Sequence, residues 1–164
     1  MQERELIDQI VNTWRVHDSI NSYLLRKMPK KGLEAVPLAS RGRDVAQVFA
    51  HMHKVRFAWL RYNSRGLVCG IQLFPKGASP KKSELEAALR LSGKAVEAFL
   101  KSALKEGRSI KSFKGNPVRW MGYLISHESH HRGQIALALK QHGMRLPQNV
   151  AIRGLWQEWY WGKL

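Results

Sequence analysis

Residues 116–143 read NPVRWMGYLISHESHHRGQIALALKQHG and contain the clearest helix of the chain. Asn116 can accept hydrogen bonds from free backbone amides, and Pro117 suits the first helical turn, where no N–H is needed. Gly143 favours the left-handed conformation that often follows a helix end. One stripe of this helix is mainly apolar and is predicted to face a core. It comprises Trp120, Leu124, His127, His131, Ile135 and Ala138.

Three further stretches show the helical spacing of apolar residues. They span residues 3–27, about 44–63 and about 79–105. The pair Ser79–Pro80 is predicted to cap the last of these stretches. Residues 64–79 contain several glycines and a proline and predict a loop. No region alternates with period two, so the sequence predicts an all-α fold, a four-helix bundle with a long connection between helices two and three.

A short aromatic segment closes the chain. Residues 154–161 contain three of the six tryptophans, Trp156, Trp159 and Trp161. Large apolar side chains are unfavourable in water, so this segment is expected to pack on the bundle or on another subunit. The 164 residues suit one domain, and we predict a single domain over residues 1–164.

Composition narrows the class of protein. A hydrophobic content of 44% excludes intrinsic disorder, and the single cysteine, Cys69, excludes an internal disulfide and a cysteine-based zinc ribbon. The first residues are acidic, and no apolar run approaches the roughly 20 residues of a membrane span, so we expect a soluble, cytoplasmic protein without a secretory signal or membrane partner. Lys and Arg number 28 against 12 Asp and Glu, which gives a net charge of +16 and an attraction for polyanions.

The placement of three histidines is the most informative feature for function. His127 and His131 lie four residues apart, on one face of the last long helix. His51 shares a stripe with Val48, Val55 and Tyr62 on the helix over residues 44–63. Three imidazoles from two helices therefore point into one interior, where they could bind a divalent metal and leave a coordination position open. The alternative is that they are ordinary core histidines held by hydrogen bonds.

The remaining histidines and a motif match point elsewhere. His53 and His130 lie well around their helices from the metal stripe and are expected at the surface or beside the site, while His17 is expected to be a core histidine rather than a fourth ligand. Residues 127–131 also match the H-E-x-x-H pattern of zinc proteases. The extended protease pattern would require glycine and histidine where Gln134 and Leu137 stand, so we reject that interpretation.

Residues 127–135, HESHHRGQI, resemble the H-x-x-x-H-R-G-Q signature of the DinB/YfiT-like family of metal-binding helix bundles. Residues 44–51, DVAQVFAH, are similar to the helix that supplies the first histidine in that family. Residues 11–25 look like its first helix, and residues 141–147 look like its exit from the last helix. The resemblance covers roughly residues 5–150.

The resemblance implies a zinc or nickel ion held by His51, His127 and His131. It also implies a homodimer and, in some members, the transfer of a low-molecular-weight thiol. Gly133 in the signature is expected to permit close helix approach. Residues expected to support the site or the packing around it, without binding the metal, are His17, His130, Arg132 and Gln134.

Metal-assisted chemistry on a small molecule, either thiol transfer or hydrolysis, is the leading functional hypothesis. A histidine-bound ion with an open position can activate water or a thiolate. Glu128 is the only acid near the three histidines and could act as a catalytic base; the alternative is a solvated carboxylate or one paired with Arg132. A structural zinc without turnover is a further alternative, which a fourth ligand such as His17 would favour.

Binding of nucleic acid or another polyanion is the hypothesis from a different class. The candidate residues cluster around the linker after the third helix and are Lys105, Arg108, Lys111, Lys114 and Arg119. Binding through such residues falls steeply with salt. No known nucleic-acid-binding motif is visible, so a solvated basic surface is the alternative.

Overall fold

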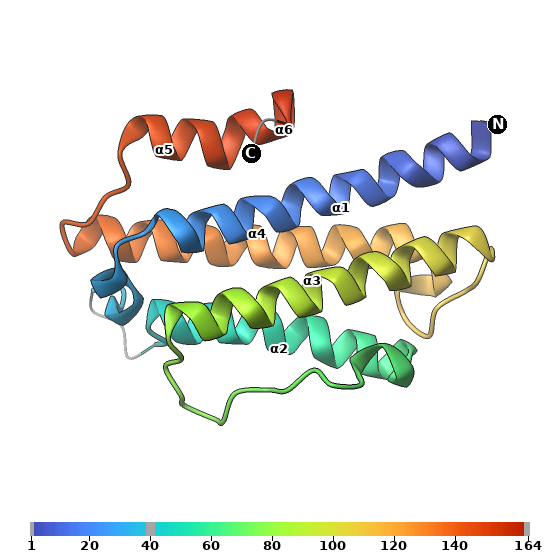
Figure 1. The fold of residues 1–164 in the computed structure, drawn as a ribbon, viewed down its shortest axis with the longest axis horizontal. Helices are drawn as coiled ribbons and strands as arrows, with labels where there is room; N and C mark the ends of the chain where they lie inside the picture. Colours follow the sequence, from blue (N-terminus) through green and yellow to red (C-terminus); the bar gives the residue numbers. More distant parts are fainter. Residues whose placement is uncertain (1, 39–41, 163–164) are drawn as a thin grey trace.

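Four long helices lie side by side along the molecule (Figure 1). The structure is a computed structural model that describes residues 2–38 and 42–162. The long helices are α1 (Gln2–Lys27), α2 (Val45–Asn63), α3 (Lys82–Lys105) and α4 (Pro117–Gln141). The short ones are η1 (Lys30–Glu34), η2 (Arg65–Val68), η3 (Phe113–Gly115), α5 (Gln148–Ile152), η4 (Arg153–Gln157) and α6 (Glu158–Trp161). The described residues contain no strand, which confirms the all-α prediction.

The connection between α2 and α3 changes the course of the chain. It includes η2 and then runs back along α2, so that α2 and α3 point the same way (Figure 1). The turn after α3 brings α4 back alongside α1, and the turn after α4 leads into the C-terminal segment (Figure 1). No helix among the described residues combines the length and the apolar character that a membrane span requires.

The predicted helix ends are right for α4, whereas for α3 the end at Lys105 is right and the start is wrong. The Asn116 side chain accepts bonds from two backbone amides of the first turn of α4, at 2.9 and 3.0 Å, and Gly143 adopts a φ of +69° after the last turn. In contrast, Ser79 does not cap α3, which begins at Lys82. The Ser79 hydroxyl donates instead to the Asp44 carboxylate at the start of α2 (2.5 Å), so it anchors the connection to α2.

A buried polar layer divides the core into two apolar clusters. On α1, Val11 and Trp14 belong to one cluster, and Leu24 and Leu25 belong to the other. The other three long helices show the same division along their length. We call the fully buried polar side chains between the clusters the polar layer; they are His17, Asn21, Arg56, Ser92 and Glu128.

The C-terminal segment α5–α6 packs along α1 (Figure 1), but several of its aromatic side chains are exposed. Gly154 is buried against the Tyr23 ring. By contrast, the exposed fractions of Trp156 and Trp161 are 58% and 65%. The prediction that this segment packs on the bundle therefore holds for its backbone and is wrong for these tryptophans. Packing on another subunit stays a prediction.

Candidate metal centre

Three histidines from α2 and α4 converge on one point. Each of His51, His127 and His131 offers a ring nitrogen, and these three atoms lie within 4.8 Å of one another. The ring centroids of His127 and His131 are 4.5 Å apart. The His51 centroid lies 5.2 Å from that of His127 and 4.9 Å from that of His131. The spacing of four residues on α4 places its two imidazoles one turn apart, as predicted. We call this group the histidine triad.

A hydrogen bond prepares His131 of the triad to donate a lone pair. His131 Nδ1 lies 2.8 Å from Gln134 Oε1, which can only accept, so Nδ1 bears the proton and Nε2 is free of one in the neutral ring. That Nε2 lies 3.2 Å from His127 Nε2. A metal-binding imidazole commonly donates its other N–H to an acceptor in this manner, and the donor set of three imidazoles suits zinc or nickel. The residues present therefore fit a divalent ion.

Local electrostatics keep the triad neutral. Burial lowers the pKa of all three imidazoles, and that of His51 falls to about 4 because nearby Arg43 adds to the effect of burial. Neutral imidazole is the form that binds metal, so little proton competition is expected at pH 7. Sequence reasoning missed Arg43. The only signal that could have suggested it is its position just before the capped start of α2.

Comparison with known protein families supports the resemblance seen in the sequence. A family model described as the DinB family matches residues 1–161. The chain belongs to the DinB family. The predicted resemblance is thereby confirmed over nearly the whole chain. No curated protein sequence matches the chain. The comparison therefore assigns no reaction and no substrate to this DinB-family member.

The polar layer lies directly beside the triad, and Glu128 is at its centre. Arg56 donates from Nε and Nη2 to the two Glu128 oxygens, each at 2.7 Å, and from Nη1 to Asp18 (2.7 Å). Asn21 and His17 also donate to Glu128, at 2.6 and 2.8 Å. Burial alone would raise the pKa of Glu128, but the charge and hydrogen bonds of Arg56 hold it at about 2. Glu128 is therefore a poorly basic carboxylate with every oxygen engaged.

His17 is a core histidine, as predicted, and it has no nitrogen left for a metal. Its Nε2 donates to Glu128, and its Nδ1 accepts from Arg132 Nη1 (3.2 Å). Burial lowers the pKa of His17, so its contact with Glu128 is a hydrogen bond of neutral imidazole rather than an ion pair. Arg132 also donates to Asn21 (2.8 Å). In the described part of the chain, Glu128 thus pairs with Arg56 and not with Arg132.

Four other expectations near the site have mixed outcomes. His130 is exposed, as predicted. His53 is buried, contrary to a surface position, and its Nε2 lies 3.0 Å from the Gln72 carbonyl oxygen. Gly133 is exposed with open space around it, so the expectation that it permits close helix approach is wrong for this chain. On α2, Tyr62 is 52% exposed, so the apolar stripe predicted through His51 does not continue to it.

The basic residues proposed for polyanion binding lie at the turn between α3 and α4. Two of them have partners: Arg108 forms an ion pair with Glu106 (3.2 Å), and the Lys111 ammonium lies 5.5 Å from the centre of the Tyr62 ring. Three are exposed and form no ion pair within the described ranges: Lys105, Lys114 and Arg119. The turn therefore retains a smaller free basic surface than the sequence predicted.

Arg56 is a further residue of the site that sequence reasoning missed. Arg56 lies on a stripe with Phe49, Met52 and Leu60, all buried. A lone charge on such a stripe indicates a buried ion pair and could have been noticed. The partner acid could also have been found, because Glu128 falls on the buried stripe of α4.

Proposed function

We propose that this DinB-family chain binds one zinc or nickel ion through His51, His127 and His131 and uses it in chemistry on a small molecule. The observation that carries the proposal is the approach of three neutral imidazole donors to within 4.8 Å of one another. The three rings supply fewer ligands than the four of a closed structural zinc site. His17 is engaged at both nitrogens, so it does not complete a closed set. We therefore favour a reactive site over a purely structural one.

A bound divalent ion would supply a Lewis acid able to activate water or a thiol for hydrolysis or thiol transfer. The protein's own contribution is orientation. Gln134 holds the His131 ring with its Nε2 toward the other two histidines. We assign Glu128 a positioning role rather than that of a base, because its oxygens are occupied and its pKa is about 2. Through Arg56, it ties α4 to α2 at the level of the triad.

Metal analysis by plasma mass spectrometry tests this proposal on untagged protein. We expect about one ion per chain in the wild type, its loss in His51→Ala, and its retention in His130→Ala. His130 is the matched control because it is an exposed histidine on the helix that supplies two ligands. Absence of metal after reconstitution with zinc and with nickel would overturn the proposal, as would a His51→Ala protein that binds as the wild type does.

We further propose that the protein is a cytoplasmic homodimer joined through its C-terminal segment. Trp156, Tyr160 and Trp161 expose 58%, 66% and 65% of their surfaces within six residues, and clustered exposed aromatics mark association surfaces. Light scattering after size exclusion should give a dimer mass for the wild type and a monomer mass for Trp156→Gln/Tyr160→Gln. Leu6→Gln, at another exposed apolar position, should remain dimeric. A monomeric wild type would contradict the proposal.

Nucleic-acid binding is the second candidate function, favoured by the exposed and unpaired Lys105, Lys114 and Arg119. In that case the metal would be structural. Fluorescence anisotropy with duplex DNA should then show affinity that falls steeply between low and moderate salt. Affinity that is absent at low salt, or unchanged as salt rises, would dismiss this candidate.

A further inference from the structure

A cavity with only positive charges opens beside the histidine triad. Its volume is about 450 Å³, and His51 forms part of its wall. Among the described residues, the charged side chains in the lining are Arg43, Lys54 and Lys76, with no aspartate or glutamate. Leu73 and Phe74 of the α2–α3 connection provide an apolar side.

The connection is held against α2 by specific bonds, so this cavity has a fixed wall. The Gln47 side chain donates to the Gly77 carbonyl (2.9 Å) on one side of the cavity. Buried His53 contacts the Gln72 carbonyl (3.0 Å) on the other. Phe74 lies between these anchors and packs near the His53 ring, with the ring centroids 5.9 Å apart. The role of His53 is thus to position the loop that closes the cavity.

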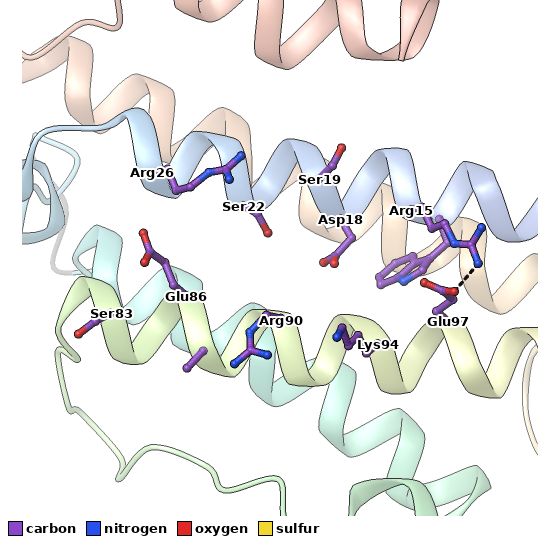
Figure 2. A pocket seen from close by; sticks show the side chains of 12 residues that line it. Arg15, Asp18, Ser19, Ser22, Arg26, Ser83, Glu86, Arg90, Lys94 and Glu97 are labelled. Atoms are coloured by element: carbon purple, nitrogen blue, oxygen red, sulfur yellow. Dashed lines mark hydrogen bonds and ion pairs between the residues drawn. The ribbon is translucent and has the colours of Figure 1, made fainter. Parts of the chain in front are cut away.

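Unbalanced charge distinguishes this cavity from the larger one between α1 and α3. That groove, of about 610 Å³, is lined by both signs of charge (Figure 2). There, Arg15 pairs with Glu97 at 2.6 Å, and the Asp18 carboxylate is held by Arg56. Around the triad cavity, by contrast, none of the three cations forms an ion pair with another described residue. Unpaired cations that converge on a concave surface attract an anion.

We infer that this cavity receives the anionic end of the small molecule on which the triad acts. The inference rests on the proposed function and names the substrate class, a carboxylate- or phosphate-bearing compound whose other end can bind a metal. Three neutral imidazoles leave both charges of a divalent ion uncompensated, which adds to the preference for an anion. Arg43 and Lys54 lie close enough to His51 for their charges to act on its ring.

A pair of thiols that differ in one charge tests the inference. The protein is loaded with cobalt(II), and 3-mercaptopropionate and neutral 3-mercapto-1-propanol are titrated in turn while the visible spectrum of the cobalt is followed. We expect the anionic thiol to bind about tenfold more tightly, which is what one charge-assisted hydrogen bond can provide. Arg43→Gln and Lys54→Gln should each reduce this ratio severalfold.

Arg90→Gln is the matched control, because Arg90 is an exposed arginine that lines the other groove (Figure 2). It removes the same charge and should leave the ratio unchanged. If cobalt binds at one ion per chain but both thiols bind equally, the inference is overturned and the metal site stands. An equal reduction in the Arg90→Gln and Arg43→Gln proteins would also overturn it. If the triad binds no cobalt, the proposed function fails and this inference fails with it.

Discussion

Replacement of Arg56 by methionine is expected to destabilise the protein strongly. The guanidinium is fully buried and donates to both oxygens of Glu128 and to Asp18. Arg56→Met keeps an unbranched side chain of similar length but leaves the Glu128 carboxylate buried with only two neutral donors, His17 and Asn21. Loss of one partner from a buried ion pair typically costs about 3–5 kcal/mol.

The chain offers a surface ion pair for comparison. Arg15 and Glu97 lie 2.6 Å apart, but their side chains are 51% and 29% exposed. Exposed pairs contribute about 0–1 kcal/mol, so Arg15→Met should change the free energy of unfolding by no more than that. The two substitutions are chemically identical, but Arg56 is buried with two acidic partners, whereas Arg15 is exposed with one.

Urea denaturation followed by circular dichroism measures both effects, with protein freed of metal so that binding does not contribute. The double variant Arg56→Met/Glu128→Leu should recover part of the loss, since it removes both buried charges together. Recovery should be incomplete because His17 and Asn21 lose their acceptor. The reasoning is refuted if Arg56→Met costs no more than Arg15→Met, or if the double variant loses the sum of the two single losses.

Three further predictions concern pH, the metal and the C-terminal segment. The pKa of Glu128 falls from 4.5 to about 2 on folding, so its contribution to stability is complete above about pH 4.5 and is lost as pH falls through about 2. The urea midpoint should therefore vary less with pH across this range in Glu128→Gln than in the wild type. Gln134→Ala should weaken metal binding about 10- to 100-fold in competition with a chromogenic chelator, and unchanged affinity would exclude its orienting role. Gly154→Ala places a Cβ into the Tyr23 ring and should increase proteolysis of the C-terminal segment, whereas Gly133→Ala, with open space around it, should not.

The sequence predicts the triad well because its ligands obey local rules. Two histidines four residues apart must share a helix face, and the third lies on a helix whose capped start at Asp44 is visible in the chain. Helix α3 was harder, because Ser79 has the residue type of a cap but bonds to Asp44 across the fold. Only the tertiary arrangement decides between these two uses of one hydroxyl.

The contacts between helices in the polar layer and the assembly of the positively charged cavity lie beyond such local rules. Arg56 and Glu128 are 72 residues apart in sequence. Each lies on the buried stripe of its own helix, but their pairing depends on how α2 and α4 are aligned. Lys76 belongs to a loop, and its approach to the wall formed by His51 depends on bonds that fold the loop back along α2. Packing in three dimensions decides which distant elements pair, and a single sequence contains little information about that packing.

On α4, different residues serve metal binding and stability, so we predict that the fold survives loss of the metal. His127 and His131 contact each other, and His131 also bonds to Gln134. Glu128, between them in sequence, bonds to α1 and α2 within the polar layer. His131→Ala therefore removes a ligand without breaking a bond of the layer. Far-UV circular dichroism should show full helicity in this variant while its metal content falls. Loss of helicity would mean that the metal, and not the buried ion pair of Arg56, joins α2 to α4.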